Sequence, residues 1–422
     1  MEPRTGKASP TRLLENLFRA EHAHLVAALT RILGTANVEL AEDVVQDALV
    51  SAMHAWRFGP PRDPKAWIVR AARNRAVDII RHDRRGMALL PELASMTTTV
   101  DTIDAALAPS ADSANQLAMM FAVCDPALTP ETHVTLILRW LCGLSPREIG
   151  QAFLVGTPTI DRRLHRGRTR LGELGRLVDV DALPDLETRR GSVLKALYLL
   201  FSEGYHGSNP SEPVRPFLCS DALRLVELML ETSATVHPDV SALAALFSFD
   251  LARLSTRLDA DGVFVPLAEQ DRTRWDRALI QRGIAHLAAS AAGESMSRWH
   301  LEAGIACEHA VAPSVRETDW ERVVGYYDLL LEGSPGPIVA LNRALAVAER
   351  DGVEEGHSQL AAVAGDKKLA RYPFYWAALA DLQRRAGRKA DARSSYGRAI
   401  ELSRSPAERD SYLRRIEGLE LS

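Results

Sequence analysis

Apolar residues recur along almost the whole chain at intervals of three or four positions, which is the spacing of one face of an α-helix. The stretch from Pro64 to Arg81 shows this most clearly, because its apolar side chains fall on one stripe: Ile68, Val69, Ala72, Ala76, Ile79 and Ile80. No stretch alternates apolar and polar residues convincingly, as a half-buried strand would. The pattern therefore predicts an all-α protein.

Changes in composition divide this helical chain into four parts. A first block covers residues 10–86, and no Lys or Arg occurs from Gly86 to Leu138. Residues 87–113 are small, polar and acidic, which predicts a flexible linker. A second block covers 114–180, and Pro and Gly residues near Pro184 and Gly191 mark a further boundary. Amphipathic helices then continue through residues 181–422.

The helix predicted from Pro64 onward has a polar side opposite its apolar stripe. Trp67, Arg70, Asn74, Arg81 and Arg85 fall on that side. Cations can contact phosphates, an Asn amide can read a base edge, and a Trp ring can stack on an unpaired base. A basic helix face is more often simply solvated, so composition alone leaves both interpretations open.

The stretch from Leu144 to Arg166 predicts a helix-turn-helix. Ser145, Pro146 and Glu148 form a capping-box pattern at the start of the first helix. Gly156 is expected to close the turn, and Thr157, followed by Pro158, is expected to cap the second helix. On that helix Ile160, Leu164 and Leu171 point inward, and the outer side carries Thr159, Arg162, Arg163, Arg166 and Arg170. Such a row of arginines suits a DNA major groove, although an unrelated solvated helix stays possible.

The first block resembles region 2 of sigma-70-family proteins, in its short extracytoplasmic-function (ECF) form. The resemblance rests on Trp67, Ala71, Ala72, Asn74, Ala76, Asp78 and Arg81, and upstream on the run Ala41–Leu49. It implies that Asp43, Gln46 and Asp47 contact core RNA polymerase at the clamp helices of its largest subunit. It also implies contacts to the single-stranded −10 promoter element by Trp67, Arg70, Arg73, Asn74, Arg81 and Arg85.

The second block resembles region 4 of the same family, although Gly150 stands where Ala is usual. This resemblance implies binding to the duplex −35 element through Thr157, Thr159, Arg162, Arg163, Arg166 and Arg170. The order of these blocks along the chain is more informative than either motif. ECF sigma factors typically have a region-2-like block, then a short acidic linker, then a region-4-like block. We expect the linker, with Asp101, Asp104 and Asp112, to mimic nucleic acid in a polymerase groove.

The last 240 or so residues carry a repeat-like pattern. Trp376, Leu379, Ala380, Gly387, Ala392, Tyr396 and Ala399 follow tetratricopeptide (TPR) spacing. With the strings Phe201–Tyr205 and Glu269–Trp275, this part resembles the C-terminal extension of one group of ECF sigma factors. We expect a TPR-like regulatory domain that modulates activity, with a regulatory protein as a possible partner. Glu203, Asp271, Arg272 and Trp275 also suit a catalytic pocket, but structural ion pairs explain them as well.

Composition adds mainly exclusions. The cysteines Cys124, Cys142, Cys219 and Cys307 lack metal-ligand or redox spacing and are expected as buried thiols. His22 and His24 fall on different helix faces, so we expect no metal site. No apolar run reaches the roughly 20 residues of a membrane span and no signal-peptide core is present, which predicts a cytoplasmic protein with no membrane contact. We expect no cofactor and no enzymatic activity.

These expectations lead to one main hypothesis and two rivals. The hypothesis is an ECF-type sigma factor that directs transcription initiation by recognising and melting −10 and −35 promoter elements. The first rival is a helix-turn-helix regulator that binds duplex DNA and senses a ligand or protein through its repeat domain. The second is an enzyme or scaffold that uses the C-terminal half. The regulator hypothesis leaves residues 41–81 unexplained, and the enzyme or scaffold hypothesis requires a deep polar pocket within residues 190–330.

Overall fold

The computed structural model describes residues 10–57, 59–84, 100–153, 155–183, 185–207, 210–293 and 295–421, excepting the side chains of residues 10–20, 82–84 and 421. Within these ranges the regular structure is helical, and the one β-bridge joins Leu258 and Phe264. The all-α prediction is therefore confirmed. The chain divides into two compact units, which we call unit 1 (Met1–Leu199 with Glu231–Thr235) and unit 2 (Leu200–Leu230 with Val236–Ser422).

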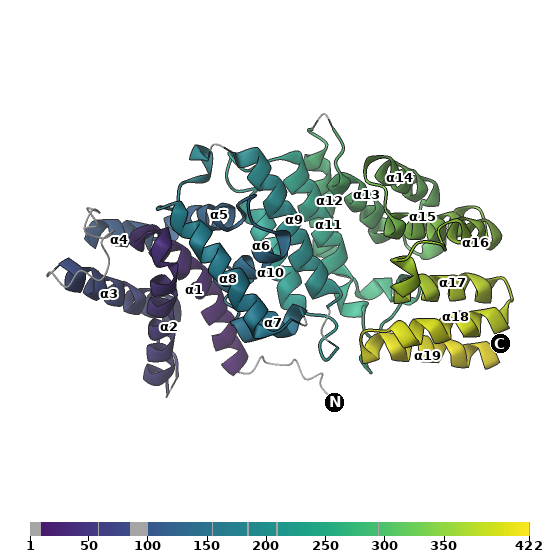
Figure 1. The fold of residues 1–422 in the computed structure, drawn as a ribbon, viewed down its shortest axis with the longest axis horizontal. Coiled ribbons are helices and arrows are strands. Elements are labelled where there is room, and N and C mark those ends of the chain that lie inside the picture. The colour runs from purple at the N-terminus through teal and green to yellow at the C-terminus, as the bar shows by residue number, and fades with distance from the viewer. Residues whose placement is uncertain are drawn as a thin grey trace. The chain divides into compact units, whose positions relative to one another are not determined.

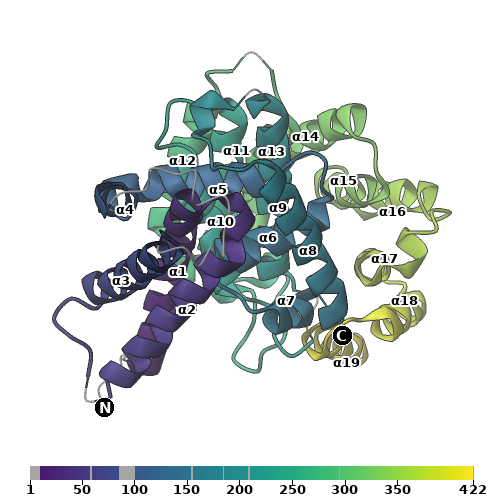
Figure 2. The same ribbon diagram turned by 60° about the vertical axis from the view of Figure 1, so that its left-hand side comes forward.

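Unit 1 is built around its first helix. The helices are α1 (Pro10–Leu33), α2 (Val38–Ala55), α3 (Pro64–Arg84), α4 (Val100–Ala106), α5 (Asp112–Val123), α6 (Pro130–Trp140), α7 (Pro146–Phe153), α8 (Thr157–Glu173) and the first part of α9 (Leu186–Tyr205). Helix α1 contacts α2, α3, α4, α5 and α6 (Figures 1 and 2). Its Leu25, Leu29 and Leu33 recur every four residues and are fully buried, as expected for a central helix.

The acidic segment before α5 differs from our expectation of a flexible linker up to residue 113. Residues 87–99 lie outside the described residues, but α4, the short 3-10 turn η3 (Pro109–Ala111) and the start of α5 follow. Ile103 and Leu107 are buried, at 2% and 5% exposure. Residues 100–113 are therefore not a flexible linker, because Ile103 and Leu107 are buried where α4 packs against α1 and α3.

Unit 2 contains the end of α9 and ten further helices among its described residues. They are α10 (Pro216–Leu228), α11 (Pro238–Ala252), α12 (Arg277–Ser290), α13 (Arg298–Val311), α14 (Trp320–Gly333), α15 (Pro337–Arg350), α16 (Val353–Ala362), α17 (Pro373–Arg385), α18 (Lys389–Leu402) and α19 (Pro406–Leu421). From α10 to α19, each helix packs against the next one along the chain, and α11 also packs against α13. The green-to-yellow ribbons of α14 to α19 in Figure 1 show this serial arrangement.

The repeat-like residues lie at the contact between α17 and α18. Ala380, Ala392, Tyr396 and Ala399 are completely buried in one cluster with Tyr412 and Leu419 of α19. Gly387 follows α17 with φ +77, a backbone conformation that favours glycine. Small side chains let these helices approach, and the tyrosine ring fills the remaining space. Membership of the TPR family itself stays a prediction.

The close approach of α6 and α8 yields a first prediction. A β-carbon at Gly167 would overlap both methyl groups of Leu136, which is fully buried and therefore poorly able to move. We expect Gly167→Ala to destabilise unit 1 by about 1–3 kcal/mol. Hydrogen–deuterium exchange of α6 and α8 in the full chain measures this effect.

The matched control is Gly191→Ala in α9, where a β-carbon would meet nothing within 4 Å. Alanine favours a helix over glycine, so this variant should be neutral or stabilised by up to about 1 kcal/mol. Equal exchange protection in both variants would contradict the packing argument.

Candidate nucleic-acid interface

Helix α2 exposes an acidic and polar face. Val44, Val45 and Ala48 are buried against the rest of unit 1, while Asp43, Gln46 and Asp47 are exposed. These three residues line a hollow of about 280 Å³ together with Leu40, Val44, Arg75 and Ile79. The Arg75 guanidinium lies 3.3 Å from a carboxylate oxygen of Asp47. Both groups are more than half exposed, so this ion pair contributes little to stability and leaves Asp47 accessible.

Helix α3 presents most of the polar side that its sequence predicts. Ile68, Ala72, Ala76 and Ile80 are buried as expected, whereas Val69 and Ile79 are half-buried and Val77 is buried instead. Arg70, Asn74 and Arg81 are exposed. Arg85 lies outside the described residues.

Trp67 of α3 is half-buried rather than free. Its ring meets that of Trp56 edge-on, with 5.5 Å between centroids and an interplanar angle of 71°. Such an aromatic pair holds the indole in one orientation beside the start of α3. Trp56 was not among the residues predicted to contact DNA, although the sequence shows an aromatic residue directly after α2.

Arg73 has an internal partner that the sequence did not indicate. Its guanidinium forms a two-pronged ion pair with the carboxylate of Asp104 in α4, with 2.8 Å between Arg73 Nη2 and Asp104 Oδ2. The next aspartate, Asp112, pairs with His24 at 2.9 Å. Both acidic residues thus pair with other side chains of unit 1, although Asp104 is exposed.

Helices α7 and α8 form the predicted helix-turn-helix. The backbone N–H of Ser145 donates to the Glu148 carboxylate at 2.7 Å, and the Glu148 N–H donates to the Ser145 hydroxyl at 3.2 Å, which confirms the capping box. Gly156 occupies the N-cap of α8, so Thr157 is the first helical residue and not the cap. A β-carbon at Gly150 would lie 2.8 Å from the carbonyl oxygen of Val155, which explains glycine at this position.

The outer face of α8 exposes only part of the expected set. Thr157, Arg162 and Arg166 are exposed, while Thr159 and Arg163 are half-buried. Arg162 donates to the Thr159 hydroxyl at 3.2 Å. Local hydrogen bonds lower the pKa of the Glu131 carboxyl against the effect of burial, and the nearby charge of Arg163 lowers it further. The opposite face packs through Ile160, Leu164 and Leu171.

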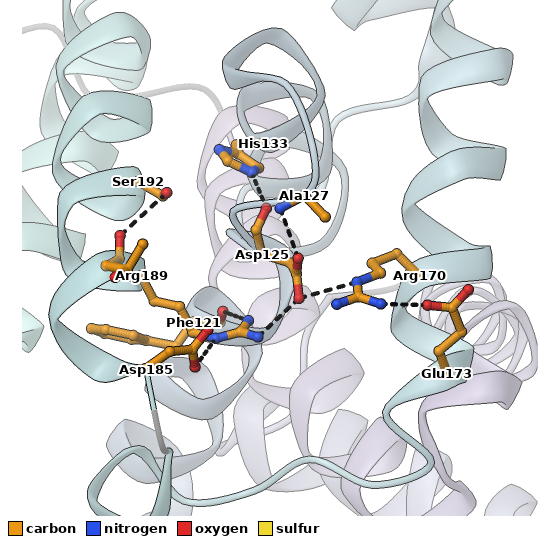
Figure 3. Close-up of polar contacts among 10 residues, drawn as sticks. Phe121, Asp125, Ala127, His133, Arg170, Glu173, Asp185, Arg189 and Ser192 are labelled. Atoms are coloured by element: carbon orange, nitrogen blue, oxygen red, sulfur yellow. Dashed lines mark hydrogen bonds and ion pairs between the residues drawn. The ribbon is translucent and has the colours of Figure 1, made fainter.

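Arg170 is held by a buried carboxylate. Figure 3 shows Asp125, which follows α5, between Arg170 of α8 and Arg189 of α9, at 3.1 and 2.8 Å. Asp125 is 1% exposed, and it also accepts from the N–H of Ala127 at 2.9 Å. Burial opposes ionisation, but these hydrogen bonds and cations keep the pKa of Asp125 below its usual value. Arg170 is therefore part of the scaffold that fixes α8.

Further ion pairs join the two helical blocks within unit 1. Glu42 of α2, 7% exposed, binds Arg139 of α6 at 2.6 Å, and burial raises the pKa of Glu42 despite the nearby cation. Glu39 pairs with Arg168 of α8, and the N–H of Thr35 donates to the carbonyl of Gly175 at 3.2 Å. None of these partners lies close in sequence, so no local pattern could have identified them.

Other chemistry is sparse among the described residues. No group of three or more His, Cys, Asp or Glu side chains there could hold a metal ion. None of the four cysteines, all of which lie in the described ranges, forms a disulfide; Cys124, Cys142 and Cys219 are buried, and Cys307 is half-buried. In the part of the chain that the structure describes, no helix combines the length and apolar character needed to span a bilayer.

Comparisons with known proteins agree with this geometry. A family model for Sigma-70 region 2 matches residues 17–86, and one for a family of unknown function (DUF6596) matches residues 189–291. An uncharacterized protein from Rhizobium meliloti is 33% identical over 377 residues, which is 88% of each chain. The ECF RNA polymerase sigma factor SigW of Bacillus subtilis is 30% identical over 147 residues, 33% of this chain and 77% of that protein. No solved structure gives a significant match.

Two exposed basic helix faces on an all-α unit, one of them within a helix-turn-helix, are typical of a DNA-binding transcription protein. The region-2 match and the similarity to SigW narrow this broad class of DNA-binding proteins to RNA polymerase sigma factors. The chain belongs to the sigma-70 family of RNA polymerase sigma factors, in its ECF form. It is a sigma factor for transcription initiation.

The Asp125 cluster yields a second prediction. Asp125→Asn removes the negative charge between Arg170 and the buried Arg189, whose side chain is 7% exposed. We expect a loss of about 3 kcal/mol in the free energy of unfolding, measured by urea unfolding at neutral pH. Asp179→Asn is the control. The Asp179 side chain is 60% exposed, so its ion pair with Arg31 should contribute no more than about 1 kcal/mol to stability.

The same cluster predicts a pH dependence. The folded pKa of Asp125 is lowered, so the stability it provides is fully present above its unfolded pKa of about 3.9 and is lost as the pH falls through the folded value. Urea midpoints of the natural chain and of Asp125→Asn should therefore converge below about pH 4. A constant difference down to pH 2 would contradict this assignment.

Proposed function

We propose that this ECF sigma factor binds core RNA polymerase through α2, opens the −10 element with α3 and reads the −35 element with α8. The observation that carries this proposal is the division of α3, which lies inside the region-2 match: its apolar stripe is buried and its basic, amide-bearing side is exposed. On α2 the proposed contacts to the clamp helices of the largest subunit are Asp43, Gln46 and Asp47, because all three are exposed on one face.

At the −10 element we assign phosphate and base contacts to the exposed side of α3. Trp67 would stack on an unpaired base, with Trp56 holding its ring, and Asn74 would read a base edge. Arg70, Arg81 and Arg85 would bind the phosphates. Arg73 would join them only by exchanging Asp104 for a phosphate, since that aspartate occupies its guanidinium. Asp104 would thereby act as a stand-in for DNA within the free protein.

At the −35 element the contacts would come from Thr157, Thr159, Arg162, Arg163 and Arg166. Arg170, which the sequence grouped with them, is better assigned as a positioning residue because Asp125 and Glu173 bind it. Arg166 is exposed and can reach guanine bidentately in the major groove. The duplex would thus meet the face of α8 opposite its buried Ile160 and Leu164.

The C-terminal helices would modulate initiation, with a regulatory protein as a possible partner. The separate family match at residues 189–291 and the compactness of unit 2 support an independent module there. This module would either activate or restrain initiation.

Promoter reading is tested by run-off transcription with bacterial core polymerase and the full-length Arg166→Ala variant. If Arg166 reads a base, replacing it should lower initiation about 5- to 150-fold, equivalent to about 1–3 kcal/mol, and relax specificity at one −35 position. Arg277→Ala on exposed α12 is the control and should initiate normally. A uniform loss across promoter sequences would identify a phosphate contact instead.

Polymerase binding is tested with Asp43→Lys in the full chain. Reversing this exposed charge should weaken binding to core polymerase about tenfold or more, as measured by fluorescence anisotropy of the labelled protein. Glu417→Lys, an exposed site in α19, is the matched control and should bind normally. If the natural chain binds duplex promoter DNA but neither binds nor activates core polymerase, the helix-turn-helix regulator is the better account.

A further inference from the structure

In unit 2 two arginines pack against the ring of Tyr205, and a third arginine lies near one of them. Tyr205 is the last residue of α9, and Arg253 and Arg257 follow α11. The guanidinium carbon of Arg257 lies 4.0 Å from the centre of the Tyr205 ring, and that of Arg253 lies 5.2 Å from it. Arg272, at the start of the 3-10 turn η7 (Arg272–Arg274), lies near Arg253, whose positive charge adds to burial in lowering the pKa of Arg272.

Negative charge is scarce in this cluster. Arg253 pairs with Asp250 at 2.6 Å. Arg257 instead donates to the backbone carbonyl of Tyr205 at 2.8 Å, and Arg272 donates to the carbonyls of His309 and Ala312. Among the described residues neither Arg257 nor Arg272 has a carboxylate partner, whereas other arginines of unit 2, such as Arg343 and Arg414, do. The cluster therefore carries more positive than negative charge at partly buried positions, which is unfavourable.

Three polar atoms of the same cluster also lack hydrogen bonds. Tyr205 Oη, Arg272 Nη2 and His309 Nδ1 are buried without a partner. The His309 ring packs edge-on against Trp320, with 5.4 Å between centroids. Burial, together with Arg253 and Arg272, lowers the pKa of His309 to about 3, so the ring is neutral at physiological pH. Leaving such groups unsatisfied is unfavourable, and a bound partner would satisfy them.

We propose that unit 2 contains a binding site for a small oxyanion, a phosphate or carboxylate group, formed by Tyr205, Arg253, Arg272 and His309. An oxyanion would supply the missing negative charge and accept hydrogen bonds from the Tyr205 hydroxyl and the Arg272 guanidinium. Its charge would also offset the cations that keep His309 neutral. The site goes beyond the proposed function, since it makes the C-terminal module a receptor for a small anionic molecule.

The location of the site favours a ligand-dependent conformation. Tyr205, Arg253 and Arg272 all lie within the segment matched by the family of unknown function, and His309 contributes from α13. The three unpartnered atoms have almost no accessible surface, so an anion reaches them only when the segment between α11 and α12 moves aside. Binding would then stabilise one arrangement of that segment over another.

The test is thermal unfolding of the full chain at constant ionic strength, with chloride replaced stepwise by inorganic phosphate or by succinate. We expect the unfolding temperature to rise in a saturable manner, by about 5 °C at a concentration 100 times the dissociation constant. A rise with phosphate alone identifies a phosphate ligand, and a rise with succinate alone identifies a carboxylate. The readout does not involve transcription, so it is independent of the proposed function.

Two variants make the test specific. Arg272→Gln should abolish the saturable rise, while Arg277→Gln, at an exposed position in α12, should retain it. Tyr205→Phe removes only the unpartnered hydroxyl, so it should fold without anion and bind the anion about tenfold more weakly. The absence of a saturable rise with both anions overturns the proposal. An equal rise in the natural chain, Arg272→Gln and Tyr205→Phe overturns it as well.

Discussion

The arrangement of unit 1 depends on one buried carboxylate, Asp125. An aspartate excluded from water is stable as an anion only when cations and N–H groups surround it, and here Arg170, Arg189 and the Ala127 N–H do so. The two arginines come from α8 and α9, which are distant in sequence from Asp125. Satisfying this single charge therefore fixes the rotation of α8 about its axis. That rotation determines which residues of α8, Arg162 and Arg166 among them, remain exposed.

The same principle governs the contact between the two helical blocks of unit 1. Glu42 lies one residue before Asp43, yet Glu42 is buried against Arg139 and Asp43 is exposed. Neighbouring acidic residues on one helix thus have different surroundings, since one binds another helix and the other is exposed. Arg73 and Arg170 show the corresponding division among the cations, since internal carboxylates bind both of them.

Unit 2 shows the opposite imbalance. Around Asp125 one carboxylate attracts two guanidinium groups, whereas around Tyr205 the cations outnumber the carboxylates and several polar atoms have no partner. A folded protein tolerates such an excess when another component supplies the missing charge. In unit 1 the charge of Asp125 is balanced by residues of the same chain. In unit 2 the cations around Tyr205 would be balanced by the proposed anionic ligand.

The sequence by itself determined the helical class, the helix-turn-helix with its capping box, and the family, because these depend on periodicity and on residues only a few positions apart. It also identified the exposed members of the proposed interfaces, including Asp43, Arg70, Asn74 and Arg166. Tertiary structure alone decided that Arg73 and Arg170 pair with carboxylates of the same chain, that residues 100–106 are helical, and that Arg253 and Arg257 pack against Tyr205. These outcomes depend on contacts between residues far apart in the chain, and a helix that presents a charge to its neighbour has the same local pattern as one that presents it to solvent.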